Sequence, residues 1–131
     1  MTQQASGTFA VTLTPQECGE ATLGRMAIDK RFEGDLEGTS KGEMLAAGTA
    51  VKSSAGYVAL ERVTGSLQGL SGTFALQHSG TMNRGAATLT IGVVPDSGTG
   101  QLTGLRGTMA IDISGGAHSY TLEYSFDEPS A

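Results

Sequence analysis

Apolar and polar residues alternate along eight segments of the chain, and this alternation restricts the fold more than any other feature of the sequence. The stretch HSYTLEYSFD (residues 118–127) shows it best: every second residue is His, Tyr, Leu or Phe, and the residues between them are polar. Successive side chains of a β-strand point to opposite faces, so a period of two predicts a strand with one buried face. The helical period of 3.6 is absent, apart from a candidate helical turn within residues 15–22.

Seven further segments show the same alternation, less regularly in some of them. They are residues 7–14, 24–32, 40–52, 56–67, 72–82, 86–94 and 107–114. Short clusters of Gly, Ser, Asn and Asp separate them, and such clusters favour the tight turns of antiparallel hairpins. Eight strands that follow one another in this way leave two sheet edges, and closure into a barrel removes both.

The fold that we predict is therefore all-β: a single eight-stranded antiparallel β-barrel over residues 1–131, with residues 1–6 and 128–131 as flexible ends. A barrel of eight strands has an interior that side chains fill or that holds one small ligand. A two-sheet sandwich is the competing arrangement, because alternation alone does not distinguish the two.

A glycine-rich pattern, G-x-L-x-G-L-x-G-T-[FM]-A, occurs twice, at residues 65–75 and 100–110. Neither copy has the G-x-G-x-x-G or G-K-[ST] spacing of a phosphate-binding loop. The pattern instead indicates a bend that leads into a strand with Thr outside and Phe or Met inside, since glycines mark bends of this kind in barrels.

Charge and cysteine content exclude several classes of partner. The net charge is −5, and the eight Lys and Arg residues form no cluster, which argues against a nucleic-acid partner. No apolar run is long enough to span a bilayer, so no membrane partner is expected. A single cysteine, Cys18, and no recognisable secretory signal favour a cytoplasmic protein. Two distant histidines argue against a zinc site, and no cofactor is expected.

Candidate functional residues are polar groups that interrupt otherwise apolar faces. The catalytic candidates are Glu61, His78 and Lys30. If these faces point into the barrel, desolvation shifts their pKa values towards acid–base chemistry, with Glu61 or His78 as the base. The candidate ligand-binding residues are Tyr57, Glu61, His78, Tyr120 and Tyr124.

A purely structural role is the alternative for each candidate. Glu61 and Lys30 could form an ion pair, and His78 could be a hydrogen-bonded core histidine. The register around Glu61 is also open, because Arg62 lies on the opposite face and either residue could point inward. Residues 38–42, GTSKG, match the G-x-S-x-G pattern, but no helix follows, so we do not expect Ser40 to be a nucleophile.

One stretch resembles a known group of barrel proteins. Residues 98–107, GTGQLTGLRG, fit the G-T-G-x-[FL]-x-G-x-x-G spacing of allene oxide cyclases and dirigent proteins. More closely, the chain resembles a family of small uncharacterised bacterial proteins assigned to that superfamily, through residues 32–45, 54–82, 93–109 and 118–124. The resemblance implies an allene oxide cyclase-like barrel that self-associates as a homodimer or homotrimer. It implies no specific chemistry, because no catalytic motif carries over residue by residue.

Two functions follow as hypotheses, since the biochemical activity is unknown. The first is binding of a small, partly apolar molecule in the barrel interior, with isomerase- or cyclase-type chemistry as an extension. The alternative is a non-enzymatic structural or interaction module, in which a filled barrel forms a homo-oligomer. The sequence does not decide between an enzyme and a binding protein, and the free volume of the interior separates the two hypotheses.

Overall fold

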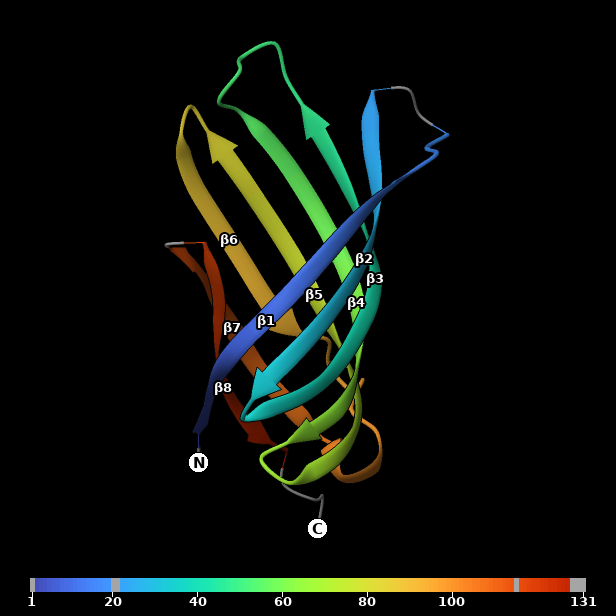
Figure 1. Cartoon of the computed structure of the whole chain (residues 1–131), viewed down its shortest axis with the longest axis vertical. Helices are drawn as coiled ribbons and strands as arrows, with labels where there is room; N and C mark the ends of the chain where they lie inside the picture. Colours follow the sequence, from blue (N-terminus) through green and yellow to red (C-terminus); the bar gives the residue numbers. More distant parts are fainter. Residues whose placement is uncertain (1, 20–21, 115, 128–131) are drawn as a thin grey trace.

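The computed structural model describes residues 2–19, 22–114 and 116–127, and it confirms the prediction of an all-β closed barrel of eight antiparallel strands (Figure 1). Each strand pairs with the next, and β8 pairs with β1. The strands are β1 (Gln3–Gln16), β2 (Leu23–Gly34), β3 (Leu36–Gly48), β4 (Ala55–Leu67), β5 (Leu70–Asn83), β6 (Ala86–Val93), β7 (Leu105–Ser114) and β8 (Ala117–Phe126). A short 3-10 helix, η1 (Gly100–Leu102), precedes β7.

The N-terminal residues differ from the expectation of a flexible end. β1 begins at Gln3, which pairs with Tyr124 of β8, and Ala5 is fully buried. These residues are part of the barrel because β1 closes the sheet against β8. Residues 1 and 128–131 of the two expected flexible ends lie outside the described residues. In the described part of residues 15–22, β1 continues to Gln16 and no helical turn follows.

One end of the barrel, which carries the β2–β3 and β4–β5 turns, is filled with side chains; we call it the packed end. Alternate residues of the strands point inward there and form one apolar cluster. Its members are Ala5, Phe9, Phe32, Leu36, Val63, Leu67, Phe74, Leu76, Ile91, Val93, Leu102, Leu105, Met109, Tyr120, Leu122 and Tyr124. Burial of each large side chain contributes roughly 1.5–3 kcal/mol, so this end supplies most of the hydrophobic stabilisation.

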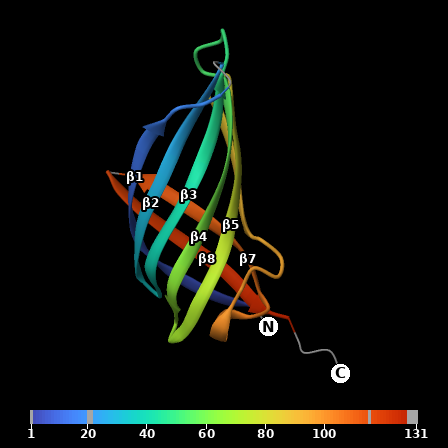
Figure 2. The same ribbon diagram turned by 90° about the vertical axis from the view of Figure 1, so that its right-hand side faces the viewer.

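The opposite end is open, because β7 and β8, with 10 residues each, are shorter than β1 to β5 and end before them. β6 pairs with β7 at only two positions, Ile91 with Met109 and Gly92 with Thr108. Figures 1 and 2 show β1 to β6 extending well beyond the β7–β8 hairpin. Leu13, Met82 and Leu89 face the inside by register, yet they are 41–46% exposed. The sheet at this open end is therefore a trough that solvent reaches.

The two copies of the glycine-rich pattern lie against each other. The first copy forms the β4–β5 hairpin, and the second forms η1 and the start of β7. Because β6 is shorter than β5, the loop around η1 completes the hydrogen bonds of β5: Thr99 N–H donates to the Thr73 carbonyl (2.8 Å), and Ser71 N–H donates to Oε1 of Gln101 (2.9 Å). Gly72 is required at this contact, since a Cβ there would lie 2.0 Å from the Thr99 carbonyl oxygen. The second copy of the pattern therefore covers the part of the β5 edge that the shorter β6 leaves unpaired.

Candidate functional site

Four polar side chains from four neighbouring strands meet inside the barrel, at the boundary between the packed and open ends. Glu61 of β4 is the centre of this polar cluster. Its Oε2 accepts hydrogen bonds from Lys30 Nζ of β2 (2.8 Å) and pairs with His78 Nε2 of β5 (2.7 Å). Its Oε1 accepts a hydrogen bond from Ser40 Oγ of β3 (2.8 Å). The side chains of Lys30, Glu61 and His78 are only 8%, 0% and 5% exposed.

The structure settles the register that the sequence left open: Glu61 points inward and Arg62 is exposed on the outer face. Glu61 lies between Ala59 and Val63, which are both buried on the same inner face. The sequence is ambiguous here because β4 carries apolar residues on both faces. The inward orientation of Glu61 is favourable because three polar side chains form hydrogen bonds with its carboxylate.

Glu61 is held in its ionised form by its neighbours. Burial raises the pKa of the Glu61 carboxyl, and this is the largest single influence on it. The hydrogen bond from His78, the charge and hydrogen bond of Lys30 and the His78 charge together outweigh burial, so the pKa lies below its usual value. Lys30 Nζ also lies 5.2 Å from the centre of the Phe9 ring, within the distance of a cation–π contact. Across the described residues, no buried side-chain nitrogen or oxygen lacks a hydrogen bond.

An apolar cavity of about 340 Å³ opens above the polar cluster, on the side of the open end; we call it the inner hollow. Its lining residues are Met44, Ala46, Ala55, Gly56, Tyr57, Gly80, Thr81, Met82, Ala87, Thr88 and Leu89. By strand register, Tyr57 and Gly80 pair one step above Ala59 and His78 on the inner face. Glu61 and His78 therefore lie beneath the inner hollow and do not form its wall.

Tyr57 connects the inner hollow with the polar cluster. Its ring lies directly over Gly80, where a Cβ would be 2.5 Å from the Tyr57 Cε1 atom. The centres of the Tyr57 and His78 rings are 6.5 Å apart. Partial burial, followed by the negative charge of Glu61, raises the pKa of the Tyr57 phenol, so its hydroxyl remains a hydrogen-bond donor at neutral pH.

The two other tyrosines of the sequence hypothesis lie at the packed end. The Tyr120 hydroxyl accepts a hydrogen bond from Leu36 N–H (2.9 Å) and is within donating distance of the Glu33 carbonyl (3.0 Å). The Tyr124 hydroxyl bonds to the side chains of Gln3 and Gln68. Both hydroxyls are thus occupied by groups that hold strand ends together, and the structure does not bring them near Tyr57, Glu61 and His78.

Ser40 belongs to the polar cluster, although the sequence hypothesis did not include it. The signal that finds it is the one that found Lys30: on β3, Ser40 is the single hydroxyl on an inward face of apolar and glycine residues. The G-x-S-x-G match drew attention to nucleophilic chemistry, but Ser40 lies mid-strand and donates its hydrogen to a carboxylate.

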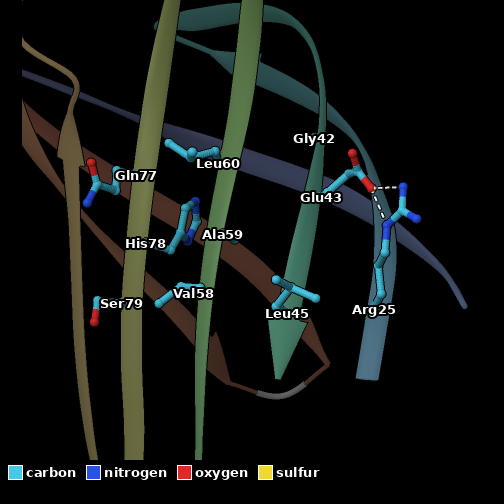
Figure 3. A pocket seen from close by; sticks show the side chains of 10 residues that line it. All are labelled: Arg25, Gly42, Glu43, Leu45, Val58, Ala59, Leu60, Gln77, His78 and Ser79. Carbon is cyan, nitrogen blue, oxygen red and sulfur yellow. Dashed lines mark hydrogen bonds and ion pairs between the residues drawn. The ribbon is translucent and has the colours of Figure 1, made fainter. Parts of the chain in front are cut away.

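A second, larger hollow of about 760 Å³ lies on the outer face of β2 to β5 (Figure 3). Val58 and Leu60 of β4 are 54% and 57% exposed at this surface. Together with Leu45 and Leu23 of the two preceding strands they form what we call the outer patch. Figure 3 shows the ion pair between Arg25 and Glu43 at its border. In strands whose inward residues are apolar and whose outward residues are polar, a group of exposed apolar side chains on the outer face is unusual.

The described residues were compared with the requirements of a metal site and of a membrane-spanning helix, and they meet neither. No group of three or more His, Cys, Asp or Glu side chains in the described part of the chain could hold a metal ion. Within residues 2–19, 22–114 and 116–127, no helix is long and apolar enough to cross a bilayer. The one cysteine, Cys18, is a half-buried free thiol outside the barrel strands.

Comparison with known proteins identifies the family. The family model described as "Protein of unknown function (DUF3224)" matches residues 5–124, so the chain belongs to this family. A crystal structure at 1.84 Å resolution of a DUF3224 protein with unknown function, from Shewanella oneidensis MR-1, is 50% identical in sequence. It superimposes with a TM-score of 0.94, over 98% of this chain and 100% of that chain. No curated protein matches. These findings support the barrel and the uncharacterised family, while the likeness to allene oxide cyclases remains a resemblance.

Proposed function

We propose that this DUF3224 protein binds a small, partly apolar molecule in the inner hollow, with the polar end of that molecule directed at the polar cluster. One observation carries the proposal: a buried, hydrogen-bonded Lys30–Glu61–His78 network lies directly beneath an apolar hollow that opens to solvent. Ligand sites of proteins have this combination of an apolar wall and a few convergent polar groups.

Stability alone does not account for the polar cluster. Replacement of a buried ion pair by apolar side chains of similar volume is often neutral or stabilising. The packed end shows that this chain fills its interior with apolar side chains at the next inward positions of the same strands, two residues away, for example with Val63 and Leu76. The presence of four polar side chains at the boundary therefore favours a functional role for them.

The size of the inner hollow suits a compact ligand. A volume of about 340 Å³ falls within the range of natural ligand pockets. At ~30 Å³ for each water-sized group, it holds about eleven such groups. Isomerase- or cyclase-type chemistry is an extension of this proposal, in which Glu61 and His78 would supply a base and Lys30 or Tyr57 a donor.

A thermal-shift screen against fatty acids, oxylipins and aromatic metabolites tests the binding proposal, because a ligand that binds the native state raises the melting temperature. A ligand that stabilises the wild type should lose its effect in Glu61→Gln and His78→Ala. The matched control is Leu60→Gln on the outer face, which should respond as the wild type does. Equal responses of all four proteins to every ligand would show that the site is misplaced.

A second candidate function is self-association through the outer patch, and the exposure of Val58 and Leu60 is the observation that favours it. The occupant that we propose is a second copy of this chain. The patch has an apolar centre and a border that carries both charges, Arg25 and Glu43, so two copies related by a two-fold axis present complementary surfaces. Sedimentation of the wild type and of Val58→Asp tests this: a wild-type homodimer should become monomeric in the variant, and a monomeric wild type would exclude the candidate.

A further inference from the structure

We infer that the molecule bound in the inner hollow is uncharged and carries an oxygen that only accepts hydrogen bonds, as in a ketone or an ether, and that the Tyr57 hydroxyl donates to this oxygen. The inference rests on the proposed function and adds the chemical class of the ligand. It follows from the side chains that line the inner hollow, because they offer one inward hydrogen-bond donor and no charge.

Tyr57 carries the one inward polar group among the described residues that line the inner hollow. Thr81 and Thr88 are the other lining residues with a polar side chain, and they pair with each other across β5 and β6. Their strand neighbours Met82 and Leu89 face the inside, so both threonine hydroxyls lie on the outer face. The remaining lining residues are Ala, Gly, Leu and Met, whose side chains form no hydrogen bonds with an oxygen.

The Tyr57 ring lies over the inner face of β5. A Cβ added at Gly80 would lie 2.5 Å from Cε1 of Tyr57 and 3.3 Å from Cδ1 of Leu89, so the ring lies beside the Leu89 side chain of β6. Tyr57 is half-buried, and its hydroxyl forms no hydrogen bond with the described part of the chain. No buried side-chain oxygen in that part lacks a partner, so this hydroxyl is accessible to a small molecule.

The Tyr57 hydroxyl favours a ligand oxygen that has no hydrogen of its own. Burial, followed by the negative charge of Glu61, raises the pKa of the Tyr57 phenol, so the hydroxyl keeps its proton at neutral pH. A carbonyl or ether oxygen accepts this hydrogen bond and needs no further partner. A ligand hydroxyl or amine would bring a hydrogen that the apolar wall leaves without an acceptor, and an unpaired buried donor is costly.

The lining of the inner hollow also disfavours charged ligands. It contains no Lys, Arg, Asp or Glu. Lys30 and Glu61 lie beneath the hollow and are paired with each other at 2.8 Å. A carboxylate or an ammonium in the hollow would therefore lose its hydration against apolar side chains without an ion of opposite charge in the wall, which costs far more than burial of a ketone.

Three naphthalene probes of similar size test the inference. They are 2-acetylnaphthalene, which has a carbonyl acceptor, 2-ethylnaphthalene, which has none, and 2-naphthoate, which is an anion. A flat aromatic body suits the hollow because Met44 and Met82 line it, and thioethers adapt to aromatic rings and contact them favourably. Dissociation constants are measured by equilibrium dialysis with the wild type, Tyr57→Phe and Tyr120→Phe. Tyr120→Phe is the matched control, because it removes a tyrosine hydroxyl at the packed end.

We expect Tyr57→Phe to weaken 2-acetylnaphthalene about tenfold, the loss of about one hydrogen bond, and to leave 2-ethylnaphthalene unchanged. Tyr120→Phe should change neither constant, and the wild type should bind 2-naphthoate more weakly than the ketone. An equal change of both neutral probes in Tyr57→Phe would overturn the inference, and so would 2-naphthoate binding as tightly as the ketone.

Infrared spectroscopy of the bound ketone provides a direct measurement on the wild type. The carbonyl stretch of 2-acetylnaphthalene should lie at a lower wavenumber than in hexane, because the carbonyl accepts a hydrogen bond, and this shift should disappear in Tyr57→Phe. A wild-type complex with the hexane wavenumber would refute the assignment.

The outcomes separate this inference from the proposed function. Binding of the neutral probes without any dependence on Tyr57, or binding of 2-naphthoate in preference to them, contradicts the inference and leaves the binding proposal intact. No binding of any of the three probes contradicts both.

Discussion

A double-mutant cycle on Lys30 and Glu61 tests whether the polar cluster stabilises the barrel or is tolerated for another purpose. Lys30→Met leaves a buried carboxylate with His78 and Ser40 only. Glu61→Leu leaves an ammonium that is 8% exposed without its anion. Loss of one partner of a buried ion pair lowers the free energy of unfolding by about 3–5 kcal/mol. We take the lower value, ~3 kcal/mol, for each single variant because solvent from the inner hollow reaches this boundary.

The combined variant, Lys30→Met with Glu61→Leu, should be more stable than either single variant. It removes both charges and fills their volume with apolar atoms, and the remaining loss is that of the hydrogen bonds of His78 and Ser40, about 1 kcal/mol each. The single costs sum to ~6 kcal/mol and the double cost is ~2 kcal/mol, so the coupling energy is ~4 kcal/mol.

Urea unfolding, followed by circular dichroism, gives the free energy of unfolding of the four proteins. A matched surface cycle on the exposed Arg25–Glu43 pair should give a coupling below about 1 kcal/mol. A double variant that is destabilised by the sum of the two single effects would refute the reasoning, because it would mean that each residue stabilises the barrel independently.

Three further predictions follow from individual contacts. The pKa of Glu61 is lower in the folded state than in the unfolded chain. The contribution of Glu61 to the free energy of unfolding is therefore complete above the unfolded pKa of about 4.3, and it is lost as the pH falls through the lower folded pKa. Glu61→Gln should remove this dependence on acidic pH, as measured by urea unfolding at a series of pH values. Gly80→Ala forces the Tyr57 ring away from Gly80, so it should lower the free energy of unfolding by about 1–3 kcal/mol and abolish ligand-induced thermal shifts. Gly24→Ala is the control: a Cβ at Gly24 has no atom within 4 Å, so neither quantity should change. Tyr120→Phe removes the hydroxyl that pairs with backbone groups at the packed end and should cost about 1–3 kcal/mol in urea unfolding without changing ligand binding.

Alternation along single strands predicts much of the site. It places Lys30, Glu61 and His78 on apolar faces, and closure of the barrel brings those faces together. The contacts among them depend on register between strands, which hairpin turns fix and which side-chain period alone does not reveal. Ser40 interrupts the inward face of its strand as Lys30 does, but only the pairing of β3 with β2 and β4 places its hydroxyl beside Glu61.

The division of the barrel into a packed and an open end was not predictable from periodicity. Tyr57 and Tyr120 both lie on the inward faces of their strands, but they lie at opposite ends of the barrel, because position along the barrel axis depends on strand stagger and length. The exposed Val58 and Leu60 also depart from simple alternation. Their presence on the outer face made the orientation of Glu61 ambiguous from sequence, and tertiary burial of Ala59 and Val63 resolves it.

Native mass spectrometry of the protein purified from its own host tests the central claim most directly. We expect a bound small molecule, released on denaturation, on the wild type and on the outer-face variant Leu60→Gln. The same molecule should be absent from Gly80→Ala, in which the Tyr57 ring is displaced from the wall of the inner hollow. A bare wild-type mass, or an adduct that persists unchanged in Gly80→Ala and His78→Leu, would contradict a ligand in the inner hollow.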